Sequence, residues 1–178
     1  MSIKIYSKLE DQIPYLLFQN FKNENCITVA SDKLIVCLKY IKNHIGLQYN
    51  LLSCISGVDL LQEKYRFSIV YDFLSLVFNS RLRVKLFIDE YIFVPSIIDI
   101  YVNANWWERE VWDLYGIYFE NHSDLRRILN DYSFEGYPMR KDFPLSGFGE
   151  VRYDQNKKVI LFEMLQLSQE YRVFSFSN

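Results

Sequence analysis

The stretch Tyr65–Ile88, which reads YRFSIVYDFLSLVFNSRLRVKLFI, decides how this chain folds. Its last eight residues alternate charged and apolar side chains, a period of two that is typical of a strand with one buried face. Asn79 and Ser80, just before them, are residues that favour a turn. The sequence therefore predicts an antiparallel hairpin of strands over 65–76 and 81–88, with a further strand over 49–56.

Helical periodicity dominates the residues before this hairpin. Apolar residues recur every three to four positions over 2–20, which predicts a first helix. A short strand over 27–30 follows. Ser31 and Asp32 then offer an N-cap to a second amphipathic helix over 33–43.

A third helix is predicted after the hairpin, in the segment that reads NWWEREVWDLYG. Asn105 and Glu108 have the spacing of a capping box, in which each side chain satisfies a backbone N–H group at the start of the helix. Gly116 is expected to end the helix. Arg109 and Asp113 are four residues apart and are predicted to pair on its surface.

The periodicity fades after Ile128, where glycine and proline become frequent among charges and aromatic residues. A long segment with little secondary structure is expected to seek another surface. We therefore predict an α+β fold. Residues 1–130 form a two-layer core domain, in which helices pack on a mixed, mostly antiparallel sheet, and residues 131–178 form an extended C-terminal arm that docks on a partner subunit.

Composition excludes several classes of protein. The chain has 178 residues with 20 Lys and Arg against 22 Asp and Glu, and this net charge of −2 argues against a nucleic-acid binder. Aromatic residues reach 17%, which suits both a core and a large protein interface. Cys26, Cys37 and Cys54 are too few for a disulfide framework, an iron–sulfur cluster or a structural zinc site of their own. We expect three reduced thiols.

No catalytic constellation stands out. Glu108 and Glu110 could form the carboxylate pair of a free-standing hydrolase, but side chains two residues apart on a helix point to different sides. His44 and His122 have no nucleophile near them in sequence. The basic pairs Arg126-Arg127 and Arg140-Lys141 are matched by nearby acids, which favours ion pairs at a protein interface over nucleic-acid binding. Those acids are Asp124, Asp131, Glu135 and Asp142.

Several spaced motifs resemble the 30 kDa subunit family of respiratory complex I, the NADH:ubiquinone oxidoreductase. The match is strongest from about residue 103 to residue 154 and extends more weakly over most of the chain. It departs from the common family pattern at Ser123 and Tyr137, where the family has a proline and a histidine. The motifs, in order, are Gly57-Val-Asp59, Val94-Pro-Ser96, Asn105–Ile117, Leu125–Leu129, Asp131-Tyr132, Phe134-Glu-Gly136, Pro138, Arg140–Pro144, Gly147, Glu150–Asp154 and Gln169–Arg172.

The resemblance implies a structural subunit of the quinone-reducing module in the peripheral arm, packed against the 49 kDa subunit and neighbouring iron–sulfur subunits. NADH, FMN, iron–sulfur clusters and ubiquinone would be carried by partner subunits, and this chain would hold no catalytic, cofactor or metal site. The alternative is the equivalent subunit of a related bacterial or plastid NAD(P)H dehydrogenase or membrane hydrogenase complex. The residues expected at the subunit interface are Glu108, Arg109, Glu110, Asp113, Gly116, His122, Arg126, Arg127, Glu135, Gly136, Pro138, Arg140, Lys141, Asp142 and Pro144.

The scarcity of alanine bears on where the chain is made. Ala30 and Ala104 are the only alanines, while Ile, Asn, Lys, Tyr and Phe are abundant, as A+T-rich coding would give. The first 21 residues contain Glu10 and Asp11 but no arginine, unlike a mitochondrial transit peptide. No apolar run reaches the roughly 20 residues of a membrane span. We expect a mitochondrially encoded protein, peripheral on the matrix side of the inner membrane.

Overall fold

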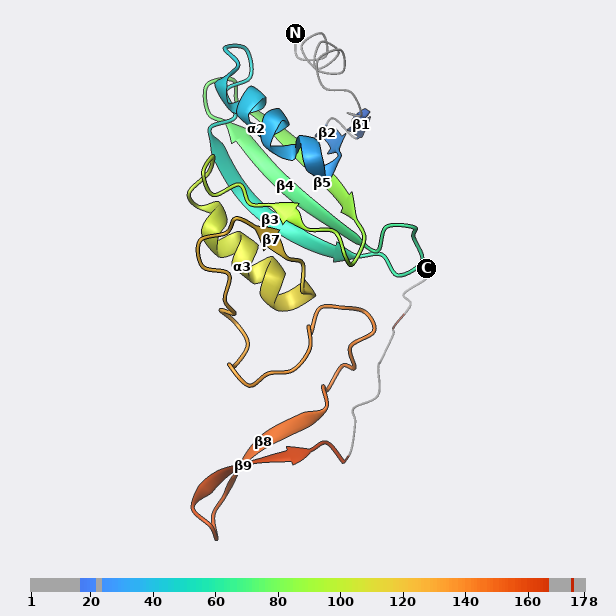
Figure 1. Ribbon diagram of the computed structural model, residues 1–178, viewed down its shortest axis with the longest axis vertical. Helices are drawn as coiled ribbons and strands as arrows, with labels where there is room; N and C mark the ends of the chain where they lie inside the picture. The colour runs from blue at the N-terminus through green and yellow to red at the C-terminus, as the bar shows by residue number, and fades with distance from the viewer. Residues whose placement is uncertain (1–16, 22–23, 167–173, 175–178) are drawn as a thin grey trace.

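The computed structural model describes residues 17–21, 24–166 and 174. Its centre is a five-stranded sheet in the order β1-β2-β5-β4-β3 (Figure 1). β2 and β5 run parallel and the other neighbours run antiparallel, so the predicted mixed, mostly antiparallel sheet is confirmed. The strands are β1 (Leu17–Phe21), β2 (Glu24–Val29), β3 (Leu51–Asp59), β4 (Phe67–Ser75) and β5 (Ser80–Ile88).

The predicted hairpin is formed by β4 and β5. Asn79, in the turn between them, has a φ of 45°, which an asparagine tolerates better than most residues. The apolar positions of β5 are buried and face the core. On the opposite face, Arg83 Nε donates to Asp72 Oδ1 at 2.8 Å and its Nη1 lies 3.1 Å from Glu24 Oε2. The alternation along β5 thus separates the core from solvent as predicted.

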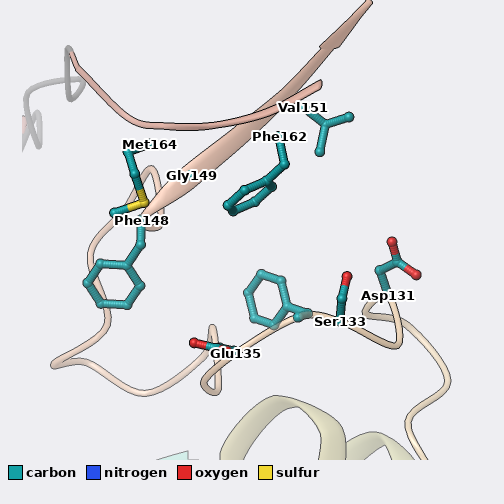
Figure 2. A pocket seen from close by; sticks show the side chains of 9 residues that line it. Asp131, Ser133, Glu135, Phe148, Gly149, Val151, Phe162 and Met164 are labelled. Carbon is teal, nitrogen blue, oxygen red and sulfur yellow. The ribbon is translucent and has the colours of Figure 1, made fainter. Parts of the chain in front are cut away.

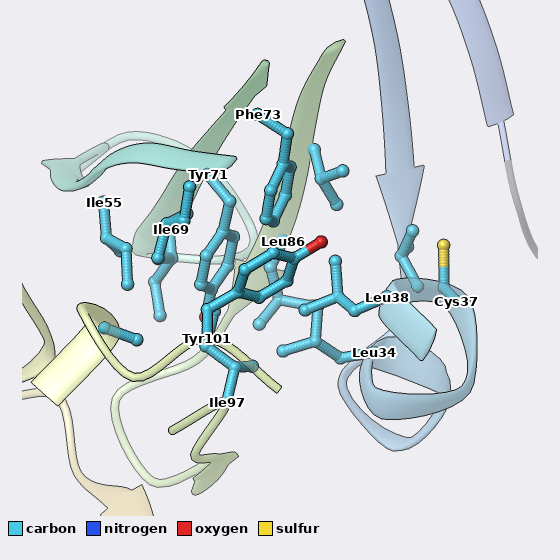
Figure 3. Packing of buried hydrophobic residues seen from close by; sticks show 14 of the residues in the cluster. Leu34, Cys37, Leu38, Ile55, Ile69, Tyr71, Phe73, Leu86, Ile97 and Tyr101 are labelled. Carbon is cyan, nitrogen blue, oxygen red and sulfur yellow. The ribbon is translucent and has the colours of Figure 1, made fainter. Parts of the chain in front are cut away.

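Two helices, α2 (Leu34–Asn43) and α3 (Ala104–Tyr115), cover one face of this sheet (Figure 1). Figure 3 shows Leu34 and Leu38 of α2 facing the aromatic and branched side chains of the sheet. Tyr71 of β4, at the centre of this layer, is completely buried. The two-layer α+β class is confirmed, and this packed layer holds α3 in a fixed position against β3.

Two predictions near the N-terminus are wrong where the structure tests them. The expected helix over 2–20 lies largely outside the described residues, but 17–20 belong to β1, because pairing with β2 prevails over local periodicity. A short 3₁₀ turn, η1 (Ser31–Lys33), precedes α2, and Lys33 occupies the N-cap position without a side-chain hydrogen bond. Ser31 Oγ instead donates to the carbonyl oxygen of Phe93, 3.2 Å away.

The segment after the sheet contains two further pairs of strands. β6 (Val94–Pro95) and β7 (Phe119–Glu120) pair in parallel on either side of α3 in the sequence. β8 (Gly149–Asp154) and β9 (Val159–Met164) form an antiparallel hairpin inside the expected arm, which extends away from the five-stranded sheet (Figure 1). The expectation of little secondary structure in the arm is therefore wrong for this part. Among the described helices, none is long and apolar enough to span a membrane.

Candidate functional site

The charged residues of α3 are mostly buried, which is unusual because a charge loses its hydration on burial. Glu108 and Asp113 are completely inaccessible and Arg109 is 8% exposed, whereas Glu110 is half-buried. α3 ends at Gly116 as predicted, where φ is +74° and a Cβ would lie 2.5 Å from the ring of Tyr137. Each buried charge therefore needs partners, and these partners define the candidate site.

Asp113 anchors the loop that follows β7. Its Oδ2 accepts hydrogen bonds from the backbone N–H groups of Ile128, Leu129 and Asn130 at 3.2, 2.7 and 2.9 Å. Its Oδ1 accepts from Asn130 Nδ2 at 2.8 Å and from Arg127 Nη1 at 3.1 Å. Burial alone would raise the pKa of Asp113, but these hydrogen bonds outweigh it and hold the pKa below its usual range.

The predicted pairing of Asp113 with Arg109 is wrong. Arg127 takes the carboxylate, while Arg109 Nε donates to the carbonyl oxygen of Arg126 at 3.2 Å and its guanidinium lies 5.2 Å from the Trp106 ring. A loop that closes over a helix can supply several donors at once, which one i,i+4 side chain on the helix surface cannot. The loop and α3 are therefore tied together at two neighbouring points.

Glu108 joins α3 to the segment after β6. Its Oε1 accepts from the N–H of Ile97 at 2.8 Å, and its Oε2 lies 2.6 Å from Ser96 Oγ. The predicted capping box is wrong, because Asn103 holds the N-cap position and the Glu108 side chain makes these tertiary bonds. Burial raises the pKa of Glu108 to about 7, although both hydrogen bonds act in the opposite direction.

His122 lies beside this carboxyl group, with Nε2 at 3.8 Å from Glu108 Oε2. Its Nδ1 accepts from the N–H of Asp124 at 3.0 Å, and its Nε2 is 3.3 Å from the carbonyl oxygen of Asn105. These contacts fit a neutral imidazole that carries its proton on Nε2. Burial lowers the pKa of His122, which agrees with a neutral structural role for this residue.

Replacing Glu108 by glutamine should remove a pH-dependent loss of stability. The pKa of Glu108 is raised from 4.5 to about 7 in the fold. Between these values the folded protein keeps a proton that the unfolded chain has lost, so ionisation destabilises the fold increasingly as pH rises, and by a constant amount above the window. This amount is about 3 kcal/mol.

The check is the free energy of unfolding of both proteins in urea, from about pH 4 to about pH 8. The difference should be small at the acid end, grow in favour of Glu108→Gln through the window, and then become constant. Comparing the two proteins cancels the opposite, acid-side contributions of Asp59 and Asp113, whose pKa values are lowered. A difference that does not change with pH would contradict a buried, protonated Glu108.

A second network connects the end of β3 to the C-terminal segment. The buried carboxylate of Asp59 accepts from Arg66 Nε at 3.1 Å and from the backbone N–H of Lys141 at 2.8 Å. Arg66 Nη2 also lies 2.8 Å from Asp142 Oδ2. Burial opposes ionisation of Asp59, but these bonds lower its pKa. Residues far apart in the sequence are thereby fixed at one edge of the sheet.

Arg140 completes this second network. Its Nε donates to the carbonyl oxygen of Tyr115 at 2.7 Å, and its Nη1 pairs with Glu90. The guanidinium stacks 4.7 Å from the ring centre of Tyr137 and 5.1 Å from that of Phe67. The predicted site residues of this segment thus bind α3 and the sheet edge of their own chain.

The remaining predicted residues are not part of one cluster. Arg126 is exposed and pairs with Asp124 at 2.9 Å, and Arg127 also donates to the carbonyl oxygen of Gly136 at 3.0 Å. Their role at a subunit interface stays a prediction. The other exposed or half-buried members are Glu110, Glu135, Pro138, Lys141, Asp142 and Pro144.

The sequence did not single out Arg66 and Glu90 as site residues. Asp59, the buried acid of this network, was noted only as part of a strand-end motif. Arg66 precedes β4 and Glu90 follows β5, so both sit at the end of the sheet where that motif lies. Charged residues that flank strands next to such a motif are the signal that could have found them.

The hydrolase alternative loses its geometry in this structure. Glu108 is inaccessible and is held by Ser96 and Ile97, so neither water nor a substrate reaches it. Glu110 lies two residues further along α3 and does not share that environment. The two carboxyl groups therefore do not flank a common substrate position.

Comparison with known proteins identifies the family. The model for "Respiratory-chain NADH dehydrogenase, 30 Kd subunit" matches residues 27–149. NADH-ubiquinone oxidoreductase subunit 9 of Reclinomonas americana is 49% identical over 176 residues, which cover 99% of this chain and 84% of that protein. NADH dehydrogenase (ubiquinone) iron-sulfur protein 3, mitochondrial, of Candida albicans is 46% identical over 89% of this chain and 57% of its own length.

Two solved structures resemble the fold. A trypsin-resistant fragment of Nqo5 superposes with a TM-score of 0.62 at 26% identity, covering 70% of this chain and 100% of the fragment. A chain of the membrane-bound sulfane sulfur reductase, an archaeal respiratory membrane complex, superposes with a TM-score of 0.69 at 27% identity. It covers 80% of this chain and 85% of that chain.

One relative is named an iron–sulfur protein, but the residues of this chain do not fit a cluster. Cys26, Cys37 and Cys54 lie on β2, α2 and β3, and Cys37 is buried in the core, where burial raises its pKa to about 12. No group of three possible metal ligands occurs in the described part of the chain. The fold, the extent of the sequence match and these relatives lead to one conclusion: the chain belongs to the family of 30 kDa subunits of the respiratory-chain NADH dehydrogenase.

Proposed function

We propose that this chain is a non-catalytic structural subunit in the quinone-reducing module of the peripheral arm of NADH:ubiquinone oxidoreductase. It supports electron transfer from NADH to ubiquinone, coupled to proton translocation, by holding neighbouring subunits in place. Its buried acids, Glu108, Asp113 and Asp59, stabilise one conformation of the chain itself. Groups used in this way are not free for chemistry on a substrate.

The observation that carries this proposal is the hairpin of β8 and β9. Directly opposed residues of the two strands share a face, and one face is apolar throughout: Val151 opposes Phe162, and Tyr153 opposes Ile160. These four side chains are 60–71% exposed. Arg152 and Glu163, on the other face, form an ion pair with an Nε to Oε2 distance of 2.7 Å.

A two-stranded hairpin is at best marginally stable alone in water, and contiguous exposed apolar surface marks an interaction site. The hairpin extends away from the body of the domain (Figure 1). Its apolar face is therefore the surface through which the arm, residues 131–178, docks on a partner. We assign that partner to the 49 kDa-type subunit, next to the iron–sulfur subunits of the peripheral arm.

The proposed location is the matrix side of the mitochondrial inner membrane, and we propose that the chain is encoded in the mitochondrion. The relative from Candida albicans is named as a mitochondrial protein. NADH, FMN, the iron–sulfur clusters and ubiquinone belong to partner subunits. The separated cysteines of this chain support that division of labour.

The purified chain should bind neither iron nor flavin and should not reduce quinone with NADH, while it forms a complex with a 49 kDa-type subunit. Elemental analysis, absorption spectroscopy, a quinone-reduction assay and size-exclusion chromatography of the mixed subunits give these results. Stoichiometric iron in the chain, or a mixture that elutes as two separate subunits, would contradict the proposal.

A second candidate is the equivalent subunit of another respiratory membrane complex. The likeness to a chain of the archaeal sulfane sulfur reductase favours it, because the fold serves there without an NADH dehydrogenase name. The 49% identity to the Reclinomonas americana protein, against 27% to the archaeal chain, favours the NADH dehydrogenase. The subunits that copurify with the chain distinguish the two.

A further inference from the structure

A groove lies between the apolar face of the β8–β9 hairpin and the loop over 131–135. Its volume is about 610 Å³. Figure 2 shows Val151 and Phe162 on the hairpin side and Asp131, Ser133 and Glu135 on the facing loop. Apolar side chains make up most of its floor, completed by Phe134, Phe148 and Met164.

The two acids of this groove have no cationic partner among the described residues. The arginines expected to match them are used elsewhere: Arg127 pairs with Asp113, and Arg140 pairs with Glu90. Asp131 Oδ1 accepts only the backbone N–H of Tyr132 at 2.8 Å. Asp131 and Glu135 thus add an uncompensated negative rim to an apolar floor.

We propose that this groove binds a segment of a partner subunit in which an aromatic or branched apolar side chain stands next to a lysine or arginine. This inference rests on the proposed function of the chain as an assembly subunit. The apolar side chain fills the space beside Phe162, and the cation neutralises Asp131 and Glu135. Charge-depleted pockets with a polar rim are typical of the centre of protein interfaces.

Neither a second copy of this chain nor its own C-terminal end suits the groove as well. A second copy that docked through the same face would bring two acidic rims together, and like charges across an interface are unfavourable. Phe174, the described residue nearest the C-terminus, is 71% exposed and so does not fill the groove. A basic, apolar segment of another subunit satisfies both the floor and the rim.

Photo-crosslinking in the assembled complex tests the proposal. Benzoylphenylalanine replaces Phe162 in the groove, and in a matched control it replaces Val159, which lies on the polar face of the same strand. Mass spectrometry should place the crosslinks from position 162 on a partner segment with Lys or Arg beside the apolar residue, and position 159 should not label that segment.

Three outcomes would overturn the inference: crosslinks from position 162 to this chain's own C-terminal residues, to a second copy, or to a partner segment without a basic residue. In each of these cases a chain that still copurifies with its partners leaves the proposed function standing. A chain that copurifies with no partner contradicts both proposals. The two failures are therefore distinguishable in one preparation.

Reversal of the rim charges gives an independent measurement. Asp131→Lys combined with Glu135→Lys should weaken retention of the chain in the complex about tenfold, because cation would then face cation. Glu120→Lys combined with Glu150→Lys, which changes the net charge equally at exposed positions outside the groove, should leave retention unchanged. Equal loss in both variants would overturn the proposed charge pairing.

Discussion

Replacing Asp113 by alanine should lower the free energy of unfolding of this chain by about 3–5 kcal/mol, the size of effect seen when one partner of a buried ion pair is removed. The carboxylate is completely buried. It accepts three backbone N–H groups, from Ile128 to Asn130, as well as the guanidinium of Arg127. Alanine would leave all these donors without an acceptor in a region closed to water.

The measurement is urea denaturation near neutral pH, with Asp124→Ala as the matched control. Asp124 also pairs with an arginine, Arg126, but both side chains are more than half exposed, so this variant should lose less than about 1 kcal/mol. Asp113→Asn keeps one acceptor oxygen and should fall between the two. Similar losses for Asp113→Ala and Asp124→Ala would contradict the anchoring role of Asp113.

Replacing Arg140 by glutamate should lower the free energy of unfolding by about 2–4 kcal/mol and release the segment around it. The new carboxylate would face Glu90 and the carbonyl oxygen of Tyr115, both of which now accept from the guanidinium. Stacking on Tyr137 and Phe67 would be lost as well. Because the segment is tied through this residue, assembly of the complex should weaken too.

Hydrogen exchange separates this local effect from general destabilisation. The N–H groups of Met139 and Lys141 donate to Leu114 O at 3.1 Å and to Asp59 Oδ2 at 2.8 Å. Both should exchange faster in Arg140→Glu than in Arg126→Glu, a charge reversal at an exposed arginine. Unchanged exchange at these two amides would show that Arg140 does not hold the segment in place.

Local patterns predicted the elements whose burial follows from their own sequence. The alternation along β5 and the turn at Asn79 are local, and so is the glycine that ends α3. The parallel pairing of β2 with β5 is not local, because it joins strands separated by a helix and a hairpin. No periodicity within either strand carries that information.

The candidate site was predicted in composition but not in geometry. The α3 charges and Arg127 and Arg140 were named, yet their partners were misassigned, because local rules pair residues three or four positions apart. Glu108 instead binds the segment after β6, and Asp113 binds a loop 15 to 17 residues further along the chain. Tertiary closure brings a dense set of donors that a helix surface cannot offer.

The β8–β9 hairpin was missed although a signal exists. In β8, Val151 and Tyr153 alternate with charged residues, which is the period of a strand. The glycines and prolines before it, together with the continuous apolar run from Val159 to Phe162, obscured this pattern. Because the exposed apolar face has no counterpart in the described part of the chain, its role becomes clear only with a partner.

Native mass spectrometry of the complex isolated through a tag on this chain tests the central claim most directly, with each subunit identified after dissociation. The account predicts one copy of this chain in a multisubunit NADH dehydrogenase that contains a 49 kDa-type subunit, with the chain itself released at its metal-free mass of 21.4 kDa plus the tag. A chain recovered alone, as a homo-oligomer, or with bound iron or flavin would contradict the account.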